Sequence, residues 1–311
     1  MILLSTLVLA APAPTAAPHG DDFSPCERIA RLAARAAFQE AGEDLLIHLA
    51  NCLNIADAGD AAACLLEAHE AAAETAEEAL EIFEARMELC DDLDEELYDP
   101  VIDPEDFVEG ISNAYQPFTL GSTWNYRKEF EEDGERIVEI IDIEVLEETR
   151  EIMGVECTIV RDTVHIDGEL VEDTFDYFAQ DVDGNVWYFG EISMNYEDGF
   201  LTDLDGSWIG GDDFAKPGIL MFAEPMVGRT YRLEWYLDEA EDAAVFLSDS
   251  EEVSVPAGDF RDCRLIQDFT PLEPDADEHK YFAPGVGLVL EVDLETGEEL
   301  VLMAYDVKKP R

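Results

Sequence analysis

The sequence GSTWNY at Gly121–Tyr126 decides the fold class, because a degenerate copy of it, GRTYRL, stands at Gly228–Leu233. Each copy is followed, at nearly equal separations, by a cysteine (Cys157 or Cys263) and then by a Tyr-Phe-Ala triplet. The triplets lie at 177–179 and 281–283. The same landmarks in the same order indicate a duplication, so we predict two copies of one unit, at residues 113–226 and 227–307.

The duplicated part has the features of antiparallel β-strands. Glu135–Val145 and Cys157–Ile166 are enriched in β-branched residues, and dipeptides typical of hairpins, such as Asp167-Gly168, separate the strand-like runs. Each unit is therefore predicted to be a curved antiparallel sheet or an incomplete barrel. The glycine-rich stretch Glu197–Pro225 is predicted to be a long loop that joins the repeats over a barrel mouth.

Residues 24–92 are predicted to form an antiparallel helical hairpin, which makes the fold class α+β. Ser24 and Pro25 are typical of a helix start, and Asp60 can cap a second helix after a turn at 57–60. Apolar spacing predicts that one stripe of the second helix faces its partner, namely Ala76, Leu80, Phe83, Met87 and Cys90.

The hairpin carries four of the six cysteines, and their positions indicate two disulfides. In a hairpin folded near residue 58, residues whose numbers sum to about 116 lie opposite each other. This condition pairs Cys26 with Cys90 and Cys52 with Cys64. Bridges within one helix would join atoms far beyond the roughly 7 Å that a disulfide allows. A chain reversal at Gly42 would instead give three helices and other pairings.

Cys157 and Cys263 occupy equivalent positions in the two repeats. Equivalent residues meet where two copies pack about a pseudo-twofold axis, so a third disulfide between them is one prediction. The alternative is two separate buried thiols, because free cysteine is among the most buried residue types.

The composition is extremely acidic, with 75 Asp and Glu against 18 Lys and Arg and a formal charge of −57. Hydrophobic residues still make up 47% of the chain, which is not the composition of a disordered protein. A solvated acidic surface adapted to salt is the favoured interpretation, and an acidic face that gathers divalent cations is the alternative. Nucleic acid is excluded as a partner, because phosphate contacts need basic patches.

The first 17 residues have the features of a signal peptide, with a short apolar run followed by small residues. We therefore expect an exported protein, periplasmic or extracellular, without a transmembrane anchor. Residues 93–112 carry many acids together with Pro100 and Pro104, and they are predicted to be an extended acidic linker or strap.

Several of these stretches are similar to an uncharacterised family of exported bacterial proteins with a Cys-bearing helical segment and a duplicated half-barrel-like β domain. The similarity lies in Tyr98–Pro104, Tyr177–Asp181, Gly184–Glu191 and Tyr281–Val289. In addition, Val255–Gly258 with Phe260 and Cys263 resembles secreted β proteins of half-barrel type. The resemblance implies fold and export, and it transfers no functional residue.

Candidate site residues are few. Asp181, Asp183 and Asn185 have the spacing of a calcium loop, but a tight Asp-Gly hairpin explains the same residues. Calcium is the one cofactor that the sequence suggests. Four tryptophans of the β part are candidates either for the core or for the lining of an apolar cleft: Trp124, Trp187, Trp208 and Trp235.

No catalytic constellation stands out, so two hypotheses follow. The first is a non-catalytic binding or interaction protein that holds an apolar ligand or a protein partner. The second is a hydrolase that uses a carboxylate pair at the sheet mouth.

Overall fold

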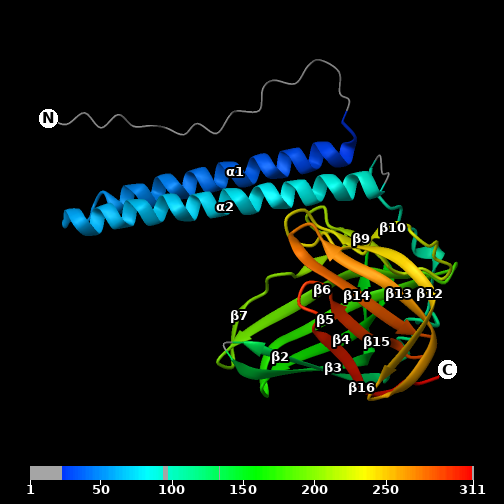
Figure 1. Cartoon of the computed structure of the whole chain (residues 1–311). Helices are drawn as coiled ribbons and strands as arrows, with labels where there is room; N and C mark the ends of the chain where they lie inside the picture. Colours follow the sequence, from blue (N-terminus) through cyan, green and yellow to red (C-terminus); the bar gives the residue numbers. More distant parts are fainter. Residues whose placement is uncertain (1–22, 94–96, 133, 310–311) are drawn as a thin grey trace.

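The computed structural model describes residues 23–93, 97–132 and 134–309, and it shows a helical hairpin followed by one nearly closed antiparallel sheet (Figure 1). The predicted α+β class with an incomplete barrel is confirmed. The predicted signal peptide at residues 1–17 lies outside the described residues.

The hairpin consists of α1 (Pro25–Cys52) and α2 (Ala58–Leu93). The predicted helix start at Ser24 and Pro25 is confirmed. The structure adds a capping box there, in which the Glu27 backbone N–H donates to the Ser24 hydroxyl at 3.1 Å and the Ser24 N–H donates to the Glu27 carboxylate. The predicted start of the second helix is wrong by a few residues. The carboxylate of Asp57 accepts from the N–H groups of Gly59 and Asp60, so the helix begins before Asp60.

Both hairpin disulfides form as predicted. Cys26 is bonded to Cys90 with 5.6 Å between the Cα atoms, and Cys52 is bonded to Cys64 with 5.5 Å. The seam between the helices uses small residues such as Ala34 and Ala79, which let the helices approach closely. The predicted stripe is therefore only partly right, since Leu80 is 44% exposed.

We predict different consequences for removing each bridge. Loss of Cys26–Cys90, which closes a segment of 64 residues beside the barrel, should cost about 4 kcal/mol. The Cys52–Cys64 bridge closes a segment of only 12 residues, so its loss should cost about 3 kcal/mol. The structural effect of this loss should be confined to the hairpin. Thermal unfolding of the paired Cys→Ala variants, followed by helical and by aromatic circular dichroism, checks this. Equal effects of both changes on the aromatic signal would contradict it.

Sixteen strands within the described residues form one sheet. The long strands are β2 (Thr123–Glu132), β3 (Glu135–Ile152), β4 (Val155–Ile166), β5 (Glu169–Asp181), β6 (Val186–Glu197), β12 (Ala243–Val255), β13 (Gly258–Thr270), β14 (Glu273–Ala283), β15 (Gly287–Asp293) and β16 (Glu299–Asp306). The short strands are β1 (Phe107–Val108), β7 (Phe200–Asp203), β8 (Trp208–Ile209), β9 (Lys216–Met221), β10 (Thr230–Arg232) and β11 (Glu234–Trp235). The neighbours run β10-β12-β13-β14-β15-β16-β2-β3-β4-β5-β6-β9-β11, so β16 and β2 join the two repeats edge to edge.

The structure repeats as the sequence does. Gly121 and Gly228 both have positive φ, of 75° and 78°, and each donates its N–H to a strand carbonyl, of Val145 and of Phe246. The strands β5 and β14 also carry a register shift at the same place, between the Tyr and Phe of each Tyr-Phe-Ala triplet. Corresponding bulges and turns at both landmarks support a duplication of the whole β unit.

The sheet nearly closes where the segment of β10 and β11 passes between its two ends. Residues 230–232 pair with β12, and the next two strand residues, Glu234 and Trp235, pair with β9. The prediction of a long loop at Glu197–Pro225 is therefore wrong in part, because β7, β8 and β9 all pair with β6. Its glycines permit close backbone approaches: a Cβ on Gly218 would lie 2.3 Å from the Leu233 carbonyl oxygen.

The acidic linker packs on the barrel as an ordered strap where the structure describes it. The Tyr98 hydroxyl donates to the Pro217 carbonyl at 2.7 Å, and the Lys216 ammonium donates to the Tyr98 carbonyl at 2.7 Å. Further along, β1 pairs with β5. The strap thereby ties the hairpin to the strand that closes the sheet.

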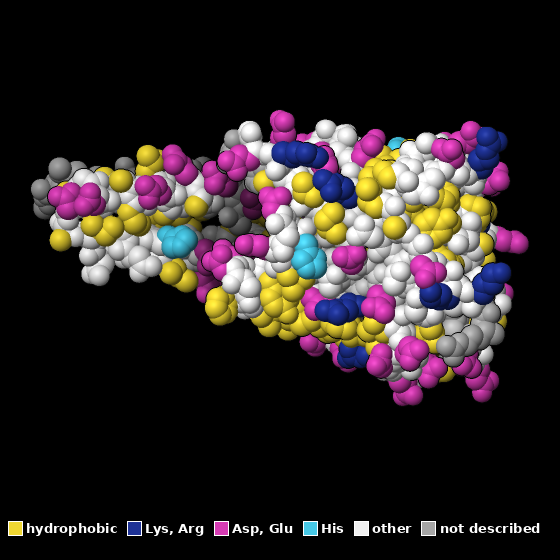
Figure 2. All heavy atoms as spheres, turned by 90° about the horizontal axis from the view of Figure 1, so that it is seen from below, with side chains coloured by type: hydrophobic (Ala, Val, Ile, Leu, Met, Phe, Trp, Pro, Cys, Tyr) yellow, Lys and Arg dark blue, Asp and Glu magenta, His cyan; other side chains and the backbone are white. Residues whose placement is uncertain are grey.

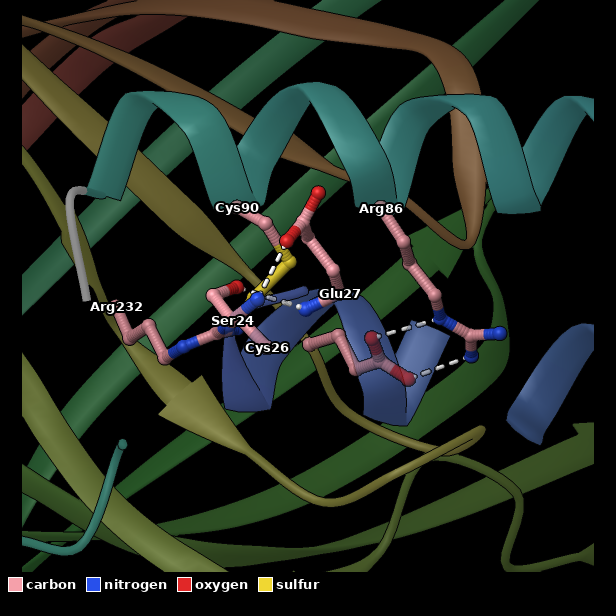
Figure 3. Close-up of a disulfide and its surroundings, with 7 residues drawn as sticks. Ser24, Cys26, Glu27, Arg86, Cys90 and Arg232 are labelled. Carbon is pink, nitrogen blue, oxygen red and sulfur yellow. Dashed lines mark hydrogen bonds and ion pairs between the residues drawn. A yellow bond between two sulfur atoms is a disulfide. The ribbon is translucent and has the colours of Figure 1, made fainter. Parts of the chain in front are cut away.

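One end of the hairpin is docked on the barrel, and the loop end extends beyond it (Figures 1 and 2). The docked end is the one with the Cys26–Cys90 bridge, and Arg86 lies close by on α2 (Figure 3). Arg86 is 4% exposed and forms a bidentate ion pair with Glu241, with nitrogen–oxygen distances of 2.6 and 3.0 Å. A second contact of the same guanidinium, at 2.6 Å, reaches the more exposed Asp238.

The predicted third disulfide does not form, and the alternative prediction of two separate buried thiols is confirmed. Cys157 and Cys263 are both free and buried, and they belong to different hydrophobic clusters. The repeats meet edge to edge along β16 and β2, so the equivalent strands β4 and β13 are not neighbours. Burial raises the pKa of Cys157 to about 12 and that of Cys263 to about 11, so both remain protonated thiols at neutral pH.

Candidate binding cavity inside the barrel

The barrel contains a partly open cavity of about 300 Å³ to which strands of both repeats contribute. This size lies at the lower end of the range for small-molecule sites, which are typically apolar with a few convergent polar groups. The barrel cavity likewise has an apolar side and a polar side. Aromatic and aliphatic side chains form one wall, and four acidic side chains with one lysine form the other.

The apolar wall is a continuous row of rings. Phe118 contacts both Trp124 and Phe178, with ring centroids 5.9 and 5.0 Å away, and Phe178 stacks on Tyr188 at 4.7 Å. The Trp124 indole N–H donates to the Val286 carbonyl at 2.7 Å, which fixes the ring. The row ends at the charged wall, because the Tyr188 hydroxyl donates to the Asp176 carboxylate at 2.7 Å.

In the second repeat, the charged wall is neutralised by Lys280. Its ammonium lies 2.8 Å from Asp268, 3.0 Å from Glu278 and 3.7 Å from Glu291. Burial lowers the pKa of Lys280, but the three carboxylates outweigh this effect and hold it above the ordinary lysine value. The ammonium therefore stays charged and makes this half of the wall a compensated ion cluster.

In the first repeat, the positions equivalent to Asp268, Lys280 and Glu291 all hold acids. Asp162 corresponds to Asp268, and Asp176, which precedes a Tyr-Phe-Ala triplet, corresponds to Lys280. The register agrees, because Asp176 is directly opposite Glu191 as Lys280 is opposite Glu291. The duplicated position thus carries a carboxylate in one repeat and an ammonium in the other.

The uncompensated acids have raised pKa values. Burial, followed by the charges of Asp176 and Glu172, raises the pKa of Asp162 to about 8. Burial also raises the pKa of Asp176 to about 7, against the lowering effect of the Tyr188 hydroxyl, and that of Glu191 to about 9. Shifts of this kind are typical of functional sites, because burial of several like charges destabilises the fold.

A fourth acid, Glu234, extends this group. On β11 its neighbour Trp235 lines the small space between hairpin and barrel, so Glu234 points the other way, into the barrel. Glu234 is 6% exposed, and the Trp208 indole lies beside its carboxylate, which is not part of the cavity lining. Burial and then the charges of Asp242 and Glu191 hold its pKa well above the ordinary value. We call Asp162, Asp176, Glu191 and Glu234 the acidic cluster.

A pH prediction follows from these pKa values. Because the folded chain binds protons at Asp162 more tightly than the unfolded chain, the free energy of unfolding falls as the pH rises from about 4 to about 8. Asp162→Asn should remove part of this fall, making the variant more stable than the parent at pH 8 by an amount on the order of a few kcal/mol. Urea unfolding at both pH values measures it.

Asp183→Asn in an exposed turn is the matched control and should leave the slope of stability against pH unchanged. An Asp162→Asn variant with the parental slope would show that Asp162 titrates normally.

The tryptophans predicted as candidate lining residues are not brought together. Trp124 lines the barrel cavity, whereas Trp187 packs outside it against Phe107, and Trp235 lines the space below the hairpin. Trp208 is buried against Tyr188 and does not line the cavity.

The candidate calcium residues form a closed turn. Both oxygens of Asp181 accept hydrogen bonds, from the backbone of Asp183 and Asn185 and from the side chains of Asn185 and Trp187. In the described parts of the chain, no three Asp, Glu, His or Cys side chains are placed to hold a metal ion. The hairpin interpretation explains these residues, and calcium binding stays a prediction.

Two other hollows are comparable in size, at about 430 and 360 Å³. The larger is lined mostly by exposed side chains of β2, β3 and β16, such as Asp142, Glu144 and Tyr305. The smaller also combines rings, Phe222 and Tyr231, with a buried charge, that of Arg232, but one acid lines it where four line the barrel cavity.

The residues of the charged wall were missed from the sequence because carboxylates are so abundant in this chain. The signal that could have found them is the repeat itself. Aligning the two Tyr-Phe-Ala triplets places Asp176 against Lys280, a reversal of charge at one interior position.

Comparison of the chain with protein-family models, with curated proteins and with solved structures finds no match. The barrel cavity therefore has to be interpreted from its own chemistry.

Proposed function

We propose that this is an exported binding protein that holds a small, partly apolar molecule in the barrel cavity. The observation that carries the proposal is the cavity of about 300 Å³ with a row of rings on one wall and buried charge on the other. Apolar walls supply affinity, and a few placed polar groups supply orientation. The two disulfides indicate an oxidising environment and so support export.

The same proposal includes a signal peptide, a periplasmic or extracellular location, and membership of the exported bacterial family. Within the residues that the structure describes, neither helix combines the length and the apolar character needed to span a bilayer.

The hydrolase alternative is less favoured by the arrangement of the carboxylates. Asp176 and Glu191 face each other on neighbouring strands, and directly opposed side chains have Cβ atoms about 5 Å apart. Both therefore lie on one wall, whereas the carboxylates of a glycosidase flank the bond that is cleaved.

Native mass spectrometry of the protein purified from its own envelope tests the proposal. A bound molecule should appear as an added mass that is lost on denaturation. Leu220→Trp, which fills the cavity, should abolish this mass, while Leu201→Trp on an exposed part of β7 should retain it. The same added mass on both variants would place the molecule elsewhere, and no added mass on the parent would contradict a resident ligand.

A salt adaptation of the surface is also proposed. Asp and Glu side chains are spread over the visible faces of hairpin and barrel, with few Lys and Arg between them (Figure 2). We expect the midpoint of thermal unfolding to rise between low and molar salt, equally for sodium and potassium, because self-repulsion is screened. An unfolding midpoint that does not change with sodium or potassium but rises with micromolar calcium would instead support a metal site at Asp181, Asp183 and Asn185.

A further inference from the structure

The two halves of the charged wall have the same framework around different central groups. In the second repeat the centre is the Lys280 ammonium, which is paired with three carboxylates. In the first repeat the centre is Asp176, with Asp162 across the β4–β5 pair and Glu191 across the β5–β6 pair. One repeat therefore contains the cation that its carboxylates require, and the other does not.

The described part of the chain supplies no cation to the first repeat. No Lys, Arg or His of the described residues forms an ion pair with Asp162, Asp176 or Glu191. Arg161 is next to Asp162 in sequence, but its side chain pairs with Asp173 at 2.7 Å on the opposite face of the sheet.

Unsatisfied acceptors mark the same place. Asp162 Oδ1, in the lining of the cavity, is buried without a hydrogen-bond partner, and so is Asp268 Oδ1 at the equivalent position of the second repeat. Glu234, which is nine-tenths buried but lies outside the lining, has the Trp208 indole beside its carboxylate. A buried acceptor without a donor costs free energy, so such atoms in a folded protein indicate a missing partner. The missing partner has to be a donor and has to be small enough for the cavity.

We infer that the ligand of the proposed binding function carries a protonated amine, which lies against the acidic cluster as the Lys280 ammonium lies against Asp268 and Glu291. The inference rests on the proposed binding function and names its ligand class. The amine donates to Asp162 and Asp176, and the apolar part of the ligand lies along Phe178 and Trp124. The ring of Tyr188, next to Asp176, adds a cation–π contact.

An organic ammonium fits the wall better than a metal ion. Within the described ranges no three acidic, His or Cys side chains converge closely enough for a metal. The row of rings beside the cluster matches an alkyl chain attached to an amine, and a bare ion has no such chain.

Three probes of equal length test the inference on the full chain: hexylammonium, hexanol and hexanoate, titrated by calorimetry at pH 8. Hexylammonium should bind at least about tenfold more tightly than hexanol, because charge-assisted hydrogen bonds are stronger than neutral ones. Hexanoate should bind most weakly, since it adds a like charge. Affinity for hexylammonium should fall on going to pH 5 as the acidic cluster is protonated, with affinity for hexanol unchanged.

Asp176→Lys is the sharpest variant, because it installs in the first repeat the ammonium that the second repeat already has. It should raise the midpoint of thermal unfolding at pH 8 and abolish hexylammonium binding. Asp176→Asn, of nearly the same shape as the parent, should fold and reduce hexylammonium affinity about tenfold while sparing hexanol.

The outcomes separate the two proposals. Equal binding of hexanol and hexylammonium, both abolished by Leu220→Trp, would overturn the amine and leave the cavity as a site for neutral ligands. Binding of no probe by the parent would count against the binding function itself. Tight hexylammonium binding that survives both Asp176 variants would place the amine at another acidic surface and overturn the inference.

Discussion

Gly218→Ala is expected to destabilise the protein by about 3 kcal/mol or more, because it forces apart the strands that close the barrel. A Cβ at this position would lie 2.3 Å from the Leu233 carbonyl oxygen and 2.6 Å from that of Arg232. Both obstructing atoms belong to the backbone, so no side-chain rotation relieves the clash. Equilibrium unfolding in urea measures the loss.

Gly42→Ala is the matched control and should have the opposite sign. Gly42 lies within α1 with nothing near the added methyl group, so the substitution should stabilise the helix by up to about 1 kcal/mol. A Gly218→Ala variant as stable as the parent would show that β9 and the β10–β11 segment are not in contact.

Lys280→Met is expected to have the second large effect, a loss of about 3 kcal/mol at pH 8. Its ammonium is the cation that pairs with Asp268, Glu278 and Glu291, and the side chain is only 24% exposed. Removing it leaves three partly buried carboxylates close together without their cation. The loss of unfolding free energy should become smaller toward pH 4, because the carboxylates that no longer have a cation can then take up protons.

Lys308→Met is the control for Lys280→Met, because Lys308 also pairs with an acid, Asp306, but lies at the surface. Exposed ion pairs contribute up to about 1 kcal/mol, so urea unfolding should barely change. Equal effects of the two lysine substitutions would show that the interior cluster is as well solvated as the surface.

The features that could be predicted from sequence depend on local chemistry or on periodic spacing. The capping box at Ser24 is a short-range pattern, and the disulfides follow from the geometry of a hairpin folded near residue 58. The duplication was visible because its glycines and its Tyr-Phe-Ala triplets are required by turns and bulges that both repeats share.

What could not be predicted depends on contacts between distant elements. Arg86 of α2 can be buried because Glu241 reaches it from the barrel, 155 residues away in sequence. Likewise, the pairing of β9 with β11 makes strands of a stretch whose glycines predict a loop. The spacing of residues within one segment contains no information about such partners.

The charged wall could not be predicted from the sequence either, because it too depends on contacts between distant elements. Alternation along β5 places Asp176 on one face, but only the closure of the sheet makes that face an interior. In a chain with 75 acids, an interior carboxylate has no distinguishing sequence of its own. Its contrast with Lys280 in the other repeat is what singles it out.

The most direct measurement of the central claim is a crystal structure of the protein purified from its own envelope at pH 8. The predicted result is non-protein electron density in the barrel cavity, with one end within hydrogen-bond distance of Asp162 and Asp176 and the remainder along Phe178 and Trp124. A cavity that holds only ordered water, with Asp162 and Asp176 hydrogen-bonded to it, would contradict the account.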